Sequence, residues 1–311
     1  PGPGEIRVKT LAAGVSSYDV MLRGHWFPGQ TPPYTPGEDI VGLVDKSGEG
    51  VAGLDVGQRV ALWTFGDAGG YAEYVCTPAE RAVPVPSDLD SVEAVALVVN
   101  YLTASLAMNE MAGVQRGERI LAHGAAGGVG SALVQLGTLA GLEVYGTASA
   151  HNHELVESLG AVPIDYRNDD FVAQIRELTG DGVDVVFDVV GGGRQLWRSS
   201  RALRQSGRLI MLGMASAMKG GIKKIPASML VVGLVKILPN GKTAPMGPGM
   251  ERYPREHMDW YRDSLAEFFD LAVTGKMTPV IADRFPLLEA ARAHEFIERG
   301  GHAGKAVLTA E

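Results

Sequence analysis

The sequence predicts an α/β protein in which a doubly wound parallel sheet follows a β-rich N-terminal region. From Arg119 onward, short apolar strands alternate with segments of helical periodicity, which is typical of parallel sheets. Residues 1–93 instead contain short strand-like runs that are broken by turn dipeptides such as Pro36-Gly37. The chain has 41 glycines among 311 residues, which agrees with many tight turns and close backbone approaches.

The individual elements follow from these patterns in chain order. In the N-terminal region, strands are predicted at residues 6–13, 40–46, 59–63, 71–77 and 82–84. A helix is predicted from Ser91, a candidate N-cap, to Met108. The alternating region contains predicted strands at 119–123, 143–148, 162–164, 183–189 and 208–212. The helices between them are predicted at 128–141, 152–160, 169–179 and 194–205.

The region 215–256 shows no such regularity. It contains a basic run at 219–224, and prolines and glycines recur between Pro239 and Pro254, so we expect a long loop. An amphipathic helix is predicted at 257–274. A short strand near Val280, a helix at 287–299 and a final strand at 306–308 complete the predicted elements.

Composition excludes several classes of protein. Lysine and arginine number 28 against 36 acidic residues, a net charge of −8, which argues against a nucleic-acid surface. The single cysteine, Cys76, excludes an internal disulfide and fits a reducing compartment, so we expect a cytoplasmic protein in which this thiol is buried and inert. The longest apolar run, Met229 to Leu238, is short and contains Lys236, so no membrane span is expected. The chain begins Pro1-Gly2 without Met, and we expect a segment to precede it.

The most specific motif is the glycine-rich turn between the predicted strand 119–123 and the helix after it. Ala125, Gly127 and Gly130 match the dinucleotide fingerprint, with alanine in place of its first glycine. Gly127 lets the backbone approach a pyrophosphate, Gly130 lets helix and strand pack closely, and the helix N-terminus is partly positive. A merely tight turn is the alternative. The residues expected to hold the cofactor here are Ala126, Gly127, Gly128, Val129 and Gly130.

The end of the next strand predicts which dinucleotide binds. An NAD site places Asp or Glu about 20 residues beyond the turn, to bind the ribose 2′-hydroxyl. This chain has Thr147-Ala148-Ser149 there, so nothing repels a 2′-phosphate, and we expect NADPH. Each nearby polar side chain could also be plain surface. Those that together could form a phosphate pocket are Ser149, His151, His153, Tyr166 and Arg167.

Further motifs extend this pattern along nearly the whole chain. They lie at residues 13–19 (AGVSSYD), 36–42 (PGEDIVG), 57–60 (GQRV), 100–104 (NYLTA), 188–192 (DVVGG) and 304–308 (GKAVL). In this order, with the turn at 125–130, they resemble the medium-chain dehydrogenase/reductase superfamily, specifically its zinc-independent quinone oxidoreductase (zeta-crystallin-like) branch. A weaker likeness, from Asp259-Trp-Tyr-Arg onward, is to oxidoreductases related to synaptic-vesicle membrane proteins.

The resemblance implies a Rossmann doubly wound sheet inserted in a GroES-like β-rich domain. The expected domains are residues 1–93 with 277–311, lacking the first strands of the family, and residues 94–276. Zinc members of the superfamily have a cysteine where this chain has Ser16 and a His-Glu pair where it has Glu38-Asp39. Zinc prefers thiolate and imidazole ligands, so we expect no metal and interpret the two carboxylates as solvated turn residues.

The same resemblance predicts a chemistry. Oxidising an alcohol without a Lewis acid is hard, whereas a quinone or an enone already stabilises the charge that hydride addition leaves. We therefore expect a small-molecule quinone or enone substrate, and the resemblance implies a homodimer. It places the following residues at the cofactor: Asn100, Thr103, Val190, Gly191, Leu212, Gly213 and Lys305.

The proton donor is less well specified. Tyr18, Asp19 and Tyr34 are the catalytic candidates, but either tyrosine could be core filler, and water could donate. Met21 stands where some relatives have a tyrosine, which leaves open a nucleotide-binding structural or regulatory module with little turnover. His123 and Asp188 receive structural interpretations: a packed core histidine, and a residue that orients the loop after its strand.

Overall fold

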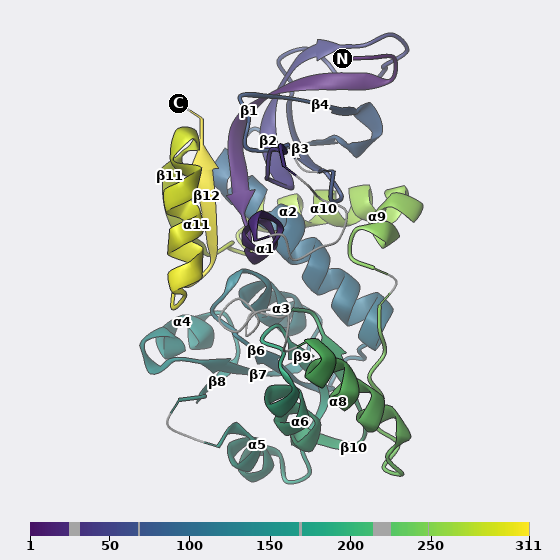
Figure 1. Cartoon of the computed structure of the whole chain (residues 1–311), viewed down its shortest axis with the longest axis vertical. Coiled ribbons are helices and arrows are strands. Elements are labelled where there is room, and N and C mark those ends of the chain that lie inside the picture. Colours follow the sequence, from purple (N-terminus) through teal and green to yellow (C-terminus); the bar gives the residue numbers. More distant parts are fainter. Residues whose placement is uncertain (25–31, 68, 168–169, 214–224, 248, 311) are drawn as a thin grey trace. The chain divides into compact units, whose positions relative to one another are not determined.

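The computed structural model describes residues 1–24, 32–67, 69–167, 170–213, 225–247 and 249–310 (Figure 1). The chain divides into two compact units, residues 1–102 with 249–311 and residues 103–248. The second unit is therefore inserted, in sequence, between two parts of the first. The fold class is the predicted one: a mixed α/β chain with a mainly antiparallel β-rich unit and a parallel sheet.

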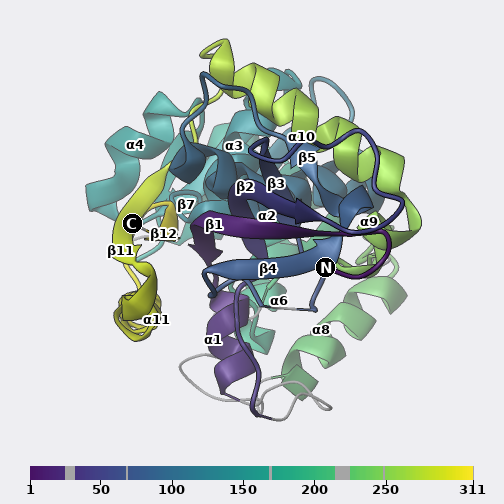
Figure 2. The same cartoon turned by 90° about the horizontal axis from the view of Figure 1, so that it is seen from above.

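The first unit is built on a seven-stranded sheet whose longest strand is β1 (Glu5–Val15). β1 pairs with β4 (Tyr74–Pro78) along its first half, with β12 (Lys305–Thr309) along its second half, and with β2 (Asp39–Ser47) on the other side (Figure 2). The rest of the sheet consists of β3 (Arg59–Trp63), β5 (Val83–Pro84) and β11 (Ile281–Pro286). Because Ala13 lies opposite Leu308, both ends of the chain build one sheet, as predicted.

Five α-helices are described in this unit or begin in it. They are α1 (Ser17–Arg23), α2 (Ser91–Leu106), α9 (Arg252–Glu256), α10 (Met258–Val273) and α11 (Ala290–Arg299). Helix α1 was not predicted. Its signal is a capping box, in which the Ser16 side chain accepts from the Asp19 N–H and the Asp19 carboxylate accepts from the Ser16 N–H.

Helix α10 lies in the first compact unit of the chain. The Tyr261 hydroxyl explains this placement: it donates to the carbonyl of Arg81 at 2.9 Å and accepts from the N–H of Trp63 at 3.1 Å. Phe65 packs edge-to-face on the same ring. The domain boundaries at 93/94 and 276/277 stay a prediction.

The second unit contains a five-stranded parallel sheet in the order β10-β9-β6-β7-β8. Its strands are β6 (Arg119–His123), β7 (Glu143–Ala148), β8 (Val162–Asp165), β9 (Val183–Asp188) and β10 (Leu203–Met211). Its described helices are α3 (Gly128–Leu139), α4 (His153–Ser158), α5 (Phe171–Thr179), α6 (Gly193–Ala202) and α8 (Ile225–Ile237). The strand order reverses beside β6, and such a switch point is where parallel sheets bind ligands.

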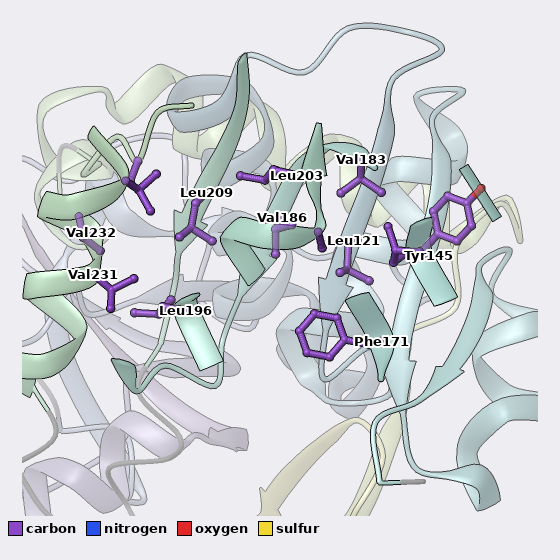
Figure 3. Packing of buried hydrophobic residues seen from close by; sticks show 14 of the residues in the cluster. Leu121, Tyr145, Phe171, Val183, Val186, Leu196, Leu203, Leu209, Val231 and Val232 are labelled. Carbon is purple, nitrogen blue, oxygen red and sulfur yellow. The ribbon is translucent and has the colours of Figure 1, made fainter. Parts of the chain in front are cut away.

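Helix α8 corrects the expectation of a long loop over 215–256. Val231, Val232 and Val235 of this helix pack into the apolar core of the unit, together with Leu121 of β6 and Leu196 of α6 (Figure 3). Burial of this apolar face in the core thus stabilises a helix over a run that the sequence analysis had assigned to a loop. The basic run 219–224 lies outside the described residues.

Two smaller expectations also need correction. Cys76 is exposed, because it occupies an outward position of β4, whose buried residues alternate with it.

Helix α2 continues as a π-helical segment to Ala112, and Ser91–Ala112 is long and apolar enough to cross a membrane by length and composition. Of its most apolar window, 83% is buried inside the structure, as in the core helices of globular proteins.

Candidate functional site

The glycine-rich turn joins β6 directly to the N-terminus of α3. Gly124 has a φ of +66°, and the Gly127 N–H closes the turn onto the Gly124 carbonyl at 2.8 Å. No side chain caps α3, and no acidic residue lies in its first turn. The first-turn N–H groups of Gly128, Val129 and Gly130 have no intrahelical acceptor, which suits an anion.

Two glycines of this turn have different physical roles. A Cβ at Gly130 would lie 2.0 Å from the Gly124 carbonyl oxygen, so the closed turn itself requires glycine there. A Cβ at Gly127 would meet only that oxygen, at 3.3 Å, and Gly127 has an ordinary φ of −75°. The turn therefore leaves open space beside Gly127, at the helix N-terminus. The arrangement fits the pyrophosphate of a dinucleotide.

The residues expected around a 2′-phosphate follow β7 and β8 in the same unit. Ser149 is buried, and its Oγ lies 3.4 Å from Nε2 of His151. The buried Nε2 of His153 has no hydrogen-bond partner. Tyr166 and Arg167 are exposed and contact each other. An imidazole nitrogen without a partner is a polar group that a phosphate oxygen would satisfy.

The loop after β9 approaches the loop after β10. Asp188 accepts the N–H groups of Val190 and Gly191 at 2.9 and 2.8 Å, as expected of a residue that orients its loop. The Asp188 carbonyl accepts the N–H of Leu212, and a Cβ at Gly213 would lie 2.7 Å from the Val189 carbonyl. The structure thus brings Val190, Gly191, Leu212 and Gly213 together at the carboxyl ends of two adjacent strands.

A cavity of about 560 Å³ opens at this loop and the start of α6. Its lining includes two arginines that sequence reasoning had not singled out, Arg194 and Arg198. Arg198 pairs with Asp170 at 2.8 Å and stacks over the Phe171 ring. The remaining lining residues are Val190, Gly191, Gly192, Gly193, Gln195 and Ala227.

In the first unit, Asp19 is the best-bonded of the predicted catalytic residues. This buried carboxylate accepts from the N–H and hydroxyl of Ser16 at 2.8 and 2.7 Å, and from the Gly37 N–H at 3.0 Å. The hydroxyl of Tyr71, which was not predicted, also bonds to Asp19. Asp19 thus organises α1 and the strand entry at Gly37, and it has no hydrogen to donate when ionised.

The two candidate tyrosines carry their protons. Burial and a hydrogen bond to Glu251 raise the pKa of Tyr18, and burial and the charge of Asp19 raise the pKa of Tyr34. Because the Tyr18 hydroxyl is engaged with Glu251, its proton is already committed to a carboxylate. Sequence reasoning missed Glu251, since it lies far along the chain from the motif that contains Tyr18.

Glu38 and Asp39 are buried, not solvated as the sequence suggested. Glu38 is 4% exposed and its Oε1 has no hydrogen-bond partner. Burial, then the charges of Asp19, Glu251 and Asp39, raise the pKa of Glu38 well above its usual range. Asp39 instead pairs with Lys305. The Lys305 ammonium is engaged in this ion pair. The role of Lys305 at the cofactor stays a prediction.

Asn100 and Thr103 lie three residues apart on α2, so they share a face of that helix, and both are buried. Among the residues that the structure describes, no three His, Cys, Asp or Glu side chains are placed to hold a metal ion.

Comparison with known proteins supplies the family. Residues 2–87 match the model of the alcohol dehydrogenase GroES-like domain, and residues 159–308 match that of the zinc-binding dehydrogenases. The quinone oxidoreductase of Rattus norvegicus is 30% identical over 313 residues, which cover 99% of this chain and 90% of that protein. The chain belongs to the medium-chain dehydrogenase/reductase superfamily, in its quinone oxidoreductase-like branch.

Other members of the superfamily extend this finding. The human synaptic vesicle membrane protein VAT-1 homolog is 36% identical over 230 residues, which cover 73% of this chain but 58% of that protein. The chain thus matches less than two thirds of the length of the mammalian VAT-1 homologs. Among solved structures, the quinone oxidoreductase of Pseudomonas syringae has a TM-score of 0.86 at 27% identity, with 99% and 92% of the two chains covered. Mycobacterial Rv1454c complexed with NADPH has a TM-score of 0.82 at 31% identity, with the same coverage.

Proposed function

We propose that this medium-chain oxidoreductase uses NADPH to reduce a quinone or an activated C=C bond, without a metal ion. The observation that carries the proposal is the geometry of the glycine-rich turn and of the neighbouring strand end in the second unit. It combines open space beside Gly127, unpartnered N–H groups at the start of α3 and no carboxylate at the end of β7. The likeness to quinone oxidoreductases, and to a mycobacterial relative complexed with NADPH, supports it.

The residues of this chain would bind and orient the dinucleotide in two places. The glycine-rich turn would hold the pyrophosphate, and Ser149 and His153 would donate hydrogen bonds to a 2′-phosphate. The backbone at Val190, Gly191, Leu212 and Gly213 would border the other end of the cofactor. When bound, NADPH supplies a hydride. The acceptor then takes a proton from a protonated side chain or from water.

Metal-independent chemistry is supported by the donor set. Burial and neighbouring charges raise the pKa of Glu38, which lies at the position of a zinc-ligating histidine in zinc members, and Asp39 is paired with Lys305. Neither group presents the thiolate or imidazole that zinc prefers. Homodimerisation, a cytoplasmic location and the absence of nucleic-acid and integral-membrane partners stay predictions beside this function.

The test is a turnover assay with purified chain, NADPH and a panel of quinones and enones. We expect NADPH oxidation with at least one acceptor, unchanged by a chelator, and less than one zinc per chain by elemental analysis. Stoichiometric zinc whose removal abolishes turnover would contradict the metal-free proposal. NADPH binding without turnover on any acceptor would favour a nucleotide-binding module, the alternative that Met21 leaves open.

A further inference from the structure

A continuous chain of four hydrogen-bonded side chains crosses the interior of the second unit. It consists of Thr147 on β7, His123 on β6, Ser199 on α6 and Asp188 on β9, and all four are buried. The sequence predicted a packed core histidine. Burial of His123 is confirmed, but both of its ring nitrogens have polar partners, which a residue that only fills space does not need.

The distances along this chain are those of ordinary hydrogen bonds. His123 Nδ1 lies 2.9 Å from Thr147 Oγ1, and His123 Nε2 lies 3.0 Å from Ser199 Oγ. Ser199 Oγ lies 2.7 Å from Asp188 Oδ2. The imidazole ring also packs edge-to-face on Phe171, with 4.8 Å between ring centroids, so its plane is fixed.

The donors and acceptors along these four side chains can be assigned in one consistent direction. The single hydroxyl hydrogen of Ser199 goes to the Asp188 carboxylate, which is closer and charged, rather than to the Gln195 carbonyl at 3.0 Å. Ser199 Oγ can then only accept from His123, so the imidazole proton is on Nε2. The bare Nδ1 accepts from the Thr147 hydroxyl, whose oxygen in turn accepts from the Gly124 N–H at 3.3 Å.

Electrostatics agrees with a neutral ring. Burial lowers the pKa of His123, while Asp188 raises it and Arg198 lowers it. A second proton on Nδ1 would leave the Thr147 hydroxyl hydrogen without its acceptor in a buried setting. The neutral form with hydrogen on Nε2 is therefore the one that satisfies every member of the chain.

The two ends of this row of hydrogen-bonded side chains reach two separate loops. At one end, Thr147 bonds to Gly124, the first residue of the glycine-rich turn. At the other end, Asp188 Oδ1 holds the N–H groups of Val190 and Gly191, which line the 560 Å³ cavity. His123 is the link between them, because it alone bonds toward both sides.

We propose that His123, as its neutral Nε2–H tautomer, is a positioning residue that holds the glycine-rich turn and the loop 190–192 in one joint conformation and thereby sets dinucleotide affinity. The effect of His123 on dinucleotide affinity rests on the proposed function. The coupling between the two loops does not, because it follows from hydrogen bonds within the second unit.

The tautomer is tested by nitrogen-15 NMR of the full chain with labelled histidine. We expect the His123 proton on Nε2, with the ring neutral between pH 7 and 8, because burial lowers its pKa. A proton found on Nδ1, or titration of this ring within that range, would overturn the proposed direction of the chain.

The coupling is tested by disturbing one end and observing the other. Thr147→Val keeps the shape of the side chain and removes the donor to His123. We expect amide hydrogen exchange at Val190 and Gly191, on the far side of β6, to accelerate at least tenfold. The matched control is Ile120→Val, which trims a buried residue of β6, the strand of His123, without removing any of these hydrogen bonds, and should change the exchange rates less than twofold.

His123→Phe completes the test, because it keeps an aromatic ring against Phe171 and removes both nitrogens. It should accelerate exchange at Gly124, Val190 and Gly191 together and raise the NADPH dissociation constant at least tenfold. If this variant does not fold, Thr147→Val still decides the question. Equal exchange rates in Thr147→Val and Ile120→Val would overturn the coupling. If the wild-type chain binds no dinucleotide, the proposed function fails, while the exchange measurements still decide the role of His123.

Discussion

Lys305 Nζ lies 2.7 Å from Asp39 Oδ2, and the two side chains are 3% and 1% exposed. This buried ion pair joins β12, near the end of the chain, to the start of β2. A Cβ at Gly14 of β1 would lie 2.4 Å from both Asp39 Oδ1 and Lys305 Cε, so glycine leaves the space in which the pair sits. A buried charge contact between distant segments thus helps to stabilise the GroES-like unit.

Lys305→Met should destabilise the protein by about 3–5 kcal/mol, because it leaves Asp39 buried without its counter-charge. Burial already raises the pKa of Asp39 against the opposing effect of Lys305, so losing the lysine raises this pKa further. Urea unfolding at pH 7 measures the loss, with the exposed Lys276→Met as control. Recovery in the double variant Lys305→Met, Asp39→Asn would show that the uncompensated charge is the cause. A loss below about 1 kcal/mol would contradict the assignment.

Glu38 should make the stability of the folded protein depend on pH in the direction opposite to that of ordinary carboxylates. Its pKa in the folded protein is raised by burial and by neighbouring charges, so the folded state retains a proton that the unfolded state releases. Stability should therefore fall as pH rises from about 4.5 toward the folded pKa, by up to about 1.4 kcal/mol per pH unit.

Glu38→Gln removes this dependence, since the amide cannot ionise. We expect the variant to gain stability relative to the wild type between pH 5 and pH 8, as measured by chemical unfolding at both values. Glu49→Gln, at an exposed position, should leave the difference unchanged. Parallel stability profiles of Glu38→Gln and the wild type would show that Glu38 ionises normally.

Local signals account for much of the fold. The strands at 119–123 and 143–148 were predicted with the bounds that the structure has, because both are short, rich in apolar residues and separated by a segment of helical periodicity. The turn between β6 and α3 was predicted from the glycine spacing together with the predicted strand before it and the predicted helix after it. Helices α1 and α8 were missed: the first has only its capping box as a signal, and the second depends on burial of Val231, Val232 and Val235.

The candidate site was less predictable, because its key contacts join residues far apart in the chain. Tyr18 is hydrogen-bonded to Glu251, and Asp39 forms an ion pair with Lys305. No local sequence pattern predicts either contact. The environment of Glu38 likewise needs the fold: a carboxylate in a Pro-Gly turn suggests solvent, whereas the structure buries it. His123 was correctly predicted to be buried, but its partners on β7 and α6 come only from tertiary structure.

Gly127→Val should abolish dinucleotide binding and leave the protein folded. The backbone tolerates a side chain at Gly127, whose φ is −75°, but the added methyl groups would fill the space expected for the pyrophosphate. Isothermal titration with NADPH and a thermal melt give the two readouts. Gly130→Ala is the contrasting variant, since its Cβ would collide with the Gly124 carbonyl, and it should lower the melting temperature. Binding by Gly127→Val within a few-fold of the wild type would mean that the pyrophosphate lies elsewhere.

Ser149 should decide the preference for NADPH over NADH. Its hydroxyl lies 3.4 Å from His151 Nε2, and a bound 2′-phosphate would accept hydrogen bonds from Ser149 and from the unpartnered His153 Nε2. Charge-assisted hydrogen bonds contribute roughly 1.5–3 kcal/mol each, so two would give on the order of 100-fold discrimination or more. Ser149→Asp replaces a donor by a negative charge, which repels the phosphate and can accept from a ribose 2′-hydroxyl.

We therefore expect Ser149→Asp to bind NADH more tightly than NADPH, with dissociation constants measured for both cofactors at fixed ionic strength. Ser149→Asn has nearly the same shape as the aspartate without its charge. It should weaken NADPH binding only modestly, because the amide can still donate to a phosphate oxygen. If the asparagine variant inverts the preference as strongly as the aspartate does, shape rather than charge governs the pocket. Equal wild-type affinity for the two cofactors would contradict a phosphate site at Ser149 altogether.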